Sequence, residues 1–204
     1  MTKIDILTLG DNRTNCYLVR EEQSKSCLVI DPGYEPETVL SRVESLGLTV
    51  EAIALTHGHF DHVGGVARIV AQIHCPVWIG EADFAKHQSP LKAFLFPLGN
   101  KNIPVSFYQD TLHAAGLTFT VYKTPGHTYG SVCLLCGDAL FTGDTLFHGA
   151  CGRTDLPGGD SDAMEKSMEF LNDLEYLGEF YPGHGCGGDF SYEKRTNAYL
   201  RGDI

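Results

Sequence analysis

The sequence predicts an α/β fold, in one domain that spans residues 1–204. In the first half, strand-like and helix-like segments alternate in the order β-β-β-α-β-α-β-α, which is typical of α/β proteins. The second half starts with a run of short strands and ends in helices. No low-complexity linker or internal repeat separates the halves, so we expect a single domain.

Apolar residues bounded by turn-forming residues predict the strands. They fall at residues 4–9, 15–20, 26–30, 50–55, 76–79, 105–108, 111–113, 117–122, 132–136, 139–142 and 179–181. Apolar residues at helical spacing predict the helices, at residues 36–46, 64–72, 81–87, 162–174 and 192–200. Gly47 suits the end of the first helix, and Asp160 or Ser161 suits the N-terminal cap of the fourth. Residues 89–104 are irregular, and they fit a flap over a substrate pocket and a loop packed on the core equally well.

Composition narrows the classes of function. The net charge is −11 and no run of Lys or Arg exceeds two, which argues against binding to nucleic acids and to anionic membranes. The N-terminus lacks the apolar core of a signal peptide, and no apolar run reaches membrane-spanning length. We therefore expect a cytoplasmic protein with an ordinary globular core, since 43% of its residues are hydrophobic.

The seven cysteines are scattered, and in a cytoplasmic chain we expect them to be reduced. Cys133 and Cys136 form a C-x-x-C pair, but a zinc ribbon would need a second pair, which the sequence lacks. Both cysteines lie in an apolar strand pattern, which favours buried thiols over a metal or redox role.

The stretch Thr-His-Gly-His-Phe-Asp-His at residues 56–62 follows a predicted strand. His57, His59 and Asp61 share a parity, so an extended turn would place them on one side, with His62 facing another way. One loop could then serve two metal ions, with His57 and His59 at the first and Asp61 and His62 at the second. The alternative is a polar, metal-free turn, which the further ligand-type residues below disfavour.

Three later segments share one local pattern, in which a strand is followed by a turn of small residues and a ligand-type residue. They end at His127, Asp144 and His184. Gly or Pro beside each of these residues lets the chain bend sharply and expose the side chain.

If Asp144 bridges, each ion has four protein ligands. The first set is His57, His59, His127 and Asp144, and the second is Asp61, His62, His184 and Asp144. Imidazole and carboxylate donors favour zinc, so we predict two zinc ions, with iron or manganese as alternatives at the second site.

Other candidate side chains lack this setting. We expect the remaining histidines to be structural or superficial: His74, His87, His113 and His148. Asp31, in the sequence Ile-Asp-Pro-Gly, fits either a hydrogen-bond partner for a ligand histidine or a cap for its own turn.

With these motifs the chain resembles the metallo-β-lactamase superfamily over nearly its whole length. The resemblance implies a four-layer αβ/βα sandwich, with the metal ions at one edge between two sheets. Within the superfamily the chain looks most like glyoxalase II, or hydroxyacylglutathione hydrolase, and most of all like its short bacterial relatives. The segments that carry this closer likeness are residues 143–147, which include Asp144, and residues 151–155.

The resemblance implies a dinuclear metal-dependent hydrolase of small thioesters such as S-lactoylglutathione. A water held between two metal ions becomes acidic enough to give a hydroxide, which would attack the carbonyl carbon. A thiolate then leaves with little help, because the pKa of a thiol is about 8.5. We assign catalytic roles to the two carboxylate ligands, Asp61 and Asp144. Arg153 falls where the family has a basic residue that contacts the glycine carboxylate of glutathione, whereas Asp155 and Cys186 stand where the family has tyrosines.

Three alternatives are open. β-Lactamases of the superfamily commonly have Cys, or no bridge, where Asp144 stands, so Asp144 argues against that activity. A persulfide dioxygenase is similar to this chain at residues 124–128 and 152–155, but it uses a single iron, and the complete second ligand set here favours two ions. A metal-binding module without catalysis would be indicated by the loss of a ligand from the second set, and none is missing.

Overall fold

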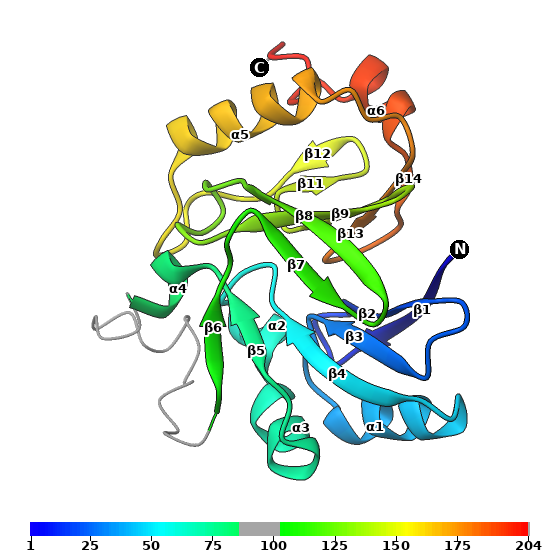
Figure 1. Ribbon diagram of the computed structural model, residues 1–204. Helices are drawn as coiled ribbons and strands as arrows, with labels where there is room; N and C mark the ends of the chain where they lie inside the picture. Colours follow the sequence, from blue (N-terminus) through cyan, green and yellow to red (C-terminus); the bar gives the residue numbers. More distant parts are fainter. Residues whose placement is uncertain (86–102, 204) are drawn as a thin grey trace.

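The computed structural model describes residues 1–85 and 103–203, in which two sheets pack face to face and helices cover their outer faces (Figure 1). This order of layers is the four-layer αβ/βα sandwich, so the predicted fold class is confirmed. Of the irregular segment at residues 89–104, for which a flap and a packed loop fit equally well, only Ile103 and Pro104 lie within the described residues. In the part of the chain that is described, none of the helices is long and apolar enough to cross a membrane.

The first half of the chain builds one sheet, whose six strands lie side by side in sequence order. They are β1 (Thr2–Leu9), β2 (Thr14–Glu21), β3 (Ser26–Ile30), β4 (Thr49–Ala54), β5 (Val77–Ile79) and β6 (Val105–Phe107). The strands from β3 onward pair in parallel. Parallel neighbours need crossover connections. The described connections contain α1 (Pro36–Ser45), α2 (Phe60–Val63), α3 (Val66–Ile73) and α4 (Glu81–Ala85).

The second half builds the other sheet, in the order β14-β13-β10-β9-β8-β7. Its strands are β7 (Thr111–Ala114), β8 (Leu117–Lys123), β9 (Val132–Cys136), β10 (Ala139–Gly143), β13 (Glu179–Pro182) and β14 (Gly188–Asp189). A separate hairpin follows β10, and two helices lie outside the sheet (Figure 1). These elements are β11 (Leu146–Phe147), β12 (Ala150–Cys151), α5 (Ser161–Asp173) and α6 (Phe190–Thr196).

Among the described residues the core consists of three apolar clusters, one between the sheets and one under each helical layer. Alternation along β3 shows how one strand serves two of them, because Leu28 and Ile30 face the other sheet while Cys27 and Val29 face the helices. Strands that are covered on both faces in this way are continuously apolar in sequence. Cys133 and Cys136 are buried and carry no disulfide, as the strand pattern predicted.

Two local predictions are wrong. Residues 60–63 form the helical turn α2, with a hydrogen bond from the His62 amide to the His59 carbonyl, so the alternation of an extended turn stops at His59. The last helix begins at Phe190, because the Asp189 carboxylate caps it by accepting from the Tyr192 amide at 3.1 Å. It ends at Thr196 instead of residue 200, because Asn197 is extended.

Candidate metal centre

Four chain segments meet at one edge between the sheets, and all seven predicted ligand residues lie on them. The segments follow the ends of β4, β8, β10 and β13. Five of the seven side chains are buried, and Asp144 and His184 are half-buried. The structure therefore brings together every residue that the motifs indicated.

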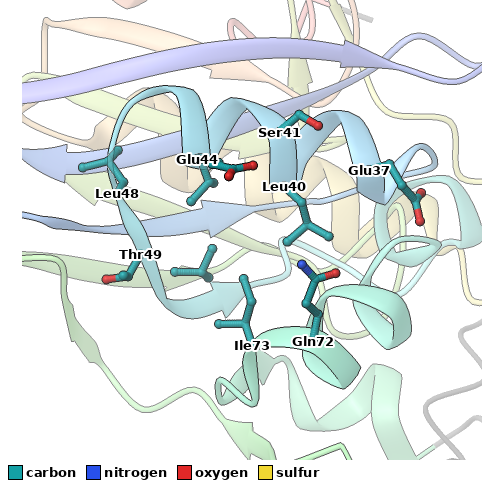
Figure 2. Close-up of a pocket in the computed structure, with 10 residues that line it drawn as sticks. Glu37, Leu40, Ser41, Glu44, Leu48, Thr49, Gln72 and Ile73 are labelled. Atoms are coloured by element: carbon teal, nitrogen blue, oxygen red, sulfur yellow. The ribbon is translucent and has the colours of Figure 1, made fainter.

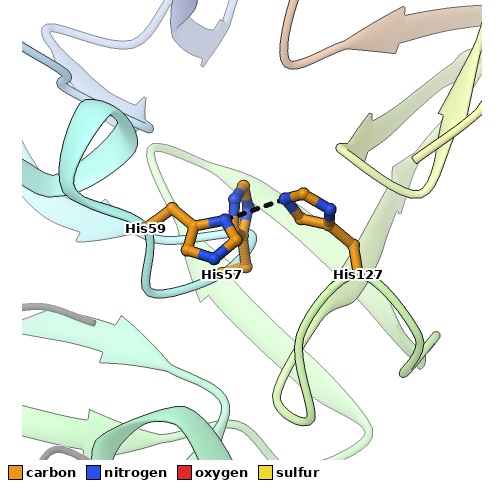
Figure 3. A group of neighbouring side chains, drawn as sticks. All are labelled: His57, His59 and His127. Carbon is orange, nitrogen blue, oxygen red and sulfur yellow. Dashed lines mark hydrogen bonds between the residues drawn. The ribbon is translucent and has the colours of Figure 1, made fainter. Parts of the chain in front are cut away.

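His57, His59 and His127 form the first group, with one ligand atom from each within 4.8 Å of the others. Figure 3 shows the three rings facing a common point from two separate loops. The closest pair is His59 Nδ1 and His127 Nε2, at 2.8 Å. His57 Nε2 is buried and has no hydrogen-bond partner among the described residues. The group could hold a cation through three ring nitrogens.

Asp61, His62 and His184 form the second group, again with ligand atoms within 4.8 Å of one another. Asp61 and His62 are consecutive on α2, and His184 Nε2 lies 3.3 Å from Asp61 Oδ2. Asp144 lies between the groups, with Oδ2 3.4 Å from His127 Nε2 and Oδ1 3.4 Å from His62 Nε2. A carboxylate in this position can contact a cation in either group.

The hydrogen bonds made by Nδ1 of three histidine rings decide which ring nitrogen holds a lone pair. Three rings point Nδ1 at an oxygen that only accepts: His62 at Asp31 Oδ2 (2.9 Å), His127 at the Arg153 carbonyl (2.8 Å) and His184 at the Asn12 carbonyl (3.1 Å). In the neutral rings Nδ1 therefore donates, and Nε2 keeps its lone pair. The Nε2 atoms of His62 and His184 face each other at 3.2 Å. Two facing lone pairs repel unless a proton or a metal ion lies between them, so these residues can hold a metal.

Asp31 is a partner of the ligand histidines, as one of its two interpretations predicted. Besides His62, it accepts from the Thr56 amide at 2.8 Å and from Thr56 Oγ1 at 2.6 Å. Thr56 Oγ1 in turn lies 3.1 Å from His57 Nδ1. Asp31 thus orients His62 directly and His57 through Thr56.

The two groups differ in how their protons are held. Burial lowers the pKa of His57, and burial together with the neighbouring His127 lowers the pKa of His59 to about 4. Burial also disfavours charge on His184, but its contacts with Asp144 and Asp61 outweigh this and raise its pKa to about 9. A metal binding to the first group would therefore meet His57 and His59 as neutral rings, whereas one binding to the second group would displace a proton from His184.

A cavity of about 260 Å³ opens onto four of the candidate ligands, and Asn12, Phe60, Arg153 and Leu156 complete its lining. The guanidinium of Arg153 is held by Asp155, with Nε and Nη2 each 2.7 Å from a carboxylate oxygen. Sequence reasoning missed this pairing. A larger cavity, of about 450 Å³, lies between α1 and α3 and contains none of the ligand residues (Figure 2).

His148 lies apart from both groups. Its side chain is 62% exposed, and its Nδ1 lies 2.7 Å from Glu193 Oε1. The expectation of a superficial histidine is confirmed. Thr14 was not predicted to matter, yet its hydroxyl donates to Asp61 Oδ2 at 3.2 Å. No spacing signal in the sequence points to such a contact.

Comparison with known proteins shows which family the chain resembles. The family model of the metallo-beta-lactamase superfamily matches residues 9–190. The hydroxyacylglutathione hydrolase GloC of Haemophilus influenzae is 33% identical over 210 residues, which cover 97% of each chain. The B3 metallo-beta-lactamase BLEG-1 is 29% identical with a TM-score of 0.82, covering 98% of this chain and 99% of that one. A protein crystallised in a di-iron-bound form is 36% identical with a TM-score of 0.78, covering 96% and 99%.

Because Asp144 lies between the two groups and His148 lies apart from them, substitutions of these two residues should affect metal binding differently. Loss of a residue that only hydrogen-bonds to a metal ligand typically weakens metal binding by roughly 10–100-fold. We expect Asp144→Ala to weaken metal binding in both groups by more than this. His148→Ala should retain full metal content, because His148 faces Glu193 instead. Metal content after gel filtration, measured by mass spectrometry on both variants, checks this. Equal losses in the two variants would contradict the placement of Asp144.

Proposed function

The chain belongs to the metallo-beta-lactamase superfamily, and from that membership we propose that it is a dinuclear metal-dependent hydrolase of small thioesters. The observation that supports this most is the convergence of seven ligand-type side chains in two groups with Asp144 between them. Zinc is the metal that these donors favour, with iron or manganese as alternatives at the second group. The di-iron form of a similar protein supports a pair of ions.

Bound ions would supply a water-derived nucleophile near neutral pH and would stabilise negative charge on the carbonyl oxygen. The chain's own residues hold and orient the rest of the site. Burial opposes charge on both carboxylates, but the charge of His62 near Asp144 and the contact of His184 with Asp61 keep their pKa values well below the ordinary range. Asp61 and Asp144 therefore stay ionised and offset the charge of the cations. Asp31 Oδ2 lies 2.9 Å from His62 Nδ1, and this contact fixes the orientation of the His62 ring.

The leaving group favours a thioester over an amide. A thiol has a pKa of about 8.5, so its thiolate departs without a general acid, whereas an amine needs a proton. The name of the relative from Haemophilus influenzae, a hydroxyacylglutathione hydrolase, supports a thioester as well. Because the chain is similar to a B3 metallo-beta-lactamase, a β-lactam is the alternative substrate to test. The cavity beside the ligands, of about 260 Å³, suits a small acyl group.

Arg153 is the residue we propose for binding the carrier half of the substrate. It lines the cavity beside the ligands, and its guanidinium can pair with a carboxylate in two contacts. Asp155 already occupies that fork, so a substrate carboxylate must displace it. Both side chains are exposed, at 61% and 68%, and exposed ion pairs are weak, so the exchange is feasible but leaves weak carrier binding.

The substrate class is tested by three assays: hydrolysis of S-lactoylglutathione and of a cephalosporin by the zinc-loaded chain, and oxygen uptake with glutathione persulfide by the iron-loaded chain. We expect thioester hydrolysis that a chelator abolishes and zinc restores, because the nucleophile depends on the metal. Inert thioesters would contradict the proposal. Oxygen uptake with a single bound iron would then indicate a dioxygenase, and turnover of the cephalosporin alone would indicate a β-lactamase.

The pairing of Arg153 with Asp155 predicts opposite effects of two substitutions. Arg153→Ala should raise KM for S-lactoylglutathione about tenfold and spare kcat, because it removes binding that is remote from the reacting carbonyl. Asp155→Asn should lower KM by up to about fivefold, because it frees the guanidinium from a weak surface pair.

Steady-state kinetics on both variants check this, with a thioester that lacks a carboxylate as the control substrate. A rise in KM in both variants would mean that the Arg153–Asp155 pair itself, and not the free guanidinium, binds the carrier.

A further inference from the structure

Asp83 is a buried carboxylate to which the proposed function gives no role. It lies on α4, and the residue is only 3% exposed. Its two oxygens accept three hydrogen bonds. Oδ2 accepts from the Gly58 amide at 2.8 Å and from Thr128 Oγ1 at 2.7 Å, and Oδ1 accepts from the Gly130 amide at 2.6 Å. All three partners donate, so the ionised carboxylate satisfies them without a proton.

These three partners belong to the two loops that carry the first group of ligands. Gly58 stands between His57 and His59, and Thr128 directly follows His127. A single side chain from a third segment therefore connects both sources of the three-histidine group. It does so through the backbone and a hydroxyl, because none of its hydrogen bonds goes to a ligand ring.

The connection is tightly packed. A Cβ added at Gly130 would lie 2.6 Å from Asp83 Cγ, and one added at Gly80 would lie 2.1 Å from the Gly130 carbonyl oxygen. Ser131 extends the contact, because its Oγ lies 2.7 Å from Thr128 Oγ1 and accepts from the Thr128 amide at 3.1 Å. The loop that carries His127 thus has little freedom to move relative to α4.

The second group has a comparable carboxylate in Asp31, which contacts the ring of His62. Asp83 differs from Asp31, because it fixes the distance between two loops and not the orientation of one ring. The quantity it controls is the approach of His59 Nδ1 to His127 Nε2, which is 2.8 Å. Ligands held at fixed separation bind a metal with less loss of conformational freedom than ligands on independent loops.

We propose that Asp83 is a positioning residue that sets the metal affinity of the three-histidine group, and of that group selectively. The proposal rests on the proposed metal-dependent function. It gives the first group a buried carboxylate of its own in Asp83, whereas Asp31 contacts the second group directly and reaches the first group only through Thr56. A residue that served only to stabilise the fold would affect both groups alike.

The test is Asp83→Asn in the full chain, with Glu193→Gln as the matched control. Glu193 is also buried, at 1% exposure, and also accepts three hydrogen bonds, from His148 Nδ1, the Gly149 amide and Asn197 Nδ2. It anchors the β11–β12 hairpin, and none of these three hydrogen bonds involves a loop of the first group. In Asp83→Asn, the new amide group must point a donor at one of the three existing donors.

The measurement is a cobalt(II) titration of the metal-free protein, followed by paramagnetic NMR. The ring N–H signal of His127 reports the cobalt affinity of the three-histidine group, and that of His62 reports the affinity of the second group. Asp83→Asn should weaken binding at the three-histidine group by about 10–100-fold and leave the other group unchanged. Glu193→Gln should leave the three-histidine group unchanged. Equal weakening of both groups, or no weakening, would overturn the proposal.

Two further outcomes are distinguished by the same measurement. If the unmodified chain binds no cobalt at these histidines, the proposed function fails; if it binds cobalt and Asp83→Asn binds equally well, only the role of Asp83 fails. Should Asp83→Asn not fold, Thr128→Val decides, because it removes one of the three donors. Weaker cobalt binding confined to the three-histidine group supports the proposal, and any other result overturns it.

Discussion

The candidate metal centre depends on one interaction, the repulsion between nitrogen lone pairs and carboxylate oxygens that face one another in a buried space. The Nε2 atoms of His62 and His184 lie 3.2 Å apart, and the Asp144 carboxylate lies 3.4 Å from His62 and from His127. Such groups repel in a medium that solvates them poorly, and a buried charge is costly unless it is paired or binds a metal. A cation in each group turns this repulsion into attraction.

The fold matters because neither sheet contains a complete centre. The first sheet delivers the loop at residues 56–62, and the second delivers the three later ligands. Asn15 on β2 joins the two, because its side-chain amide donates to the carbonyls of Pro182 and Gly185 at 3.0 and 2.9 Å. The same strand holds Asp61 through Thr14. Cross-sheet contacts of this kind place His184 beside α2.

What the sequence predicts depends on how local the signal is. His127, Asp144 and His184 each follow a strand and a turn of small residues, so all three could be identified as candidates. The helical turn α2 was missed, because four residues are too few for a period to emerge. Asp83 and Asp155 were missed as partners because each acts through contacts that leave no spacing pattern. The two-residue strands β11, β12 and β14 are likewise too short to detect.

Anomalous diffraction at the zinc edge, from crystals of the zinc-loaded chain, tests the central claim most directly. Two peaks should flank Asp144, one of them about 2.0–2.1 Å from Nε2 of His57, Nδ1 of His59 and Nε2 of His127. The other should lie within the same bonding range of Nε2 of His62 and of His184. A single peak, or a peak bonded to neither histidine group, would contradict a dinuclear centre bridged by Asp144.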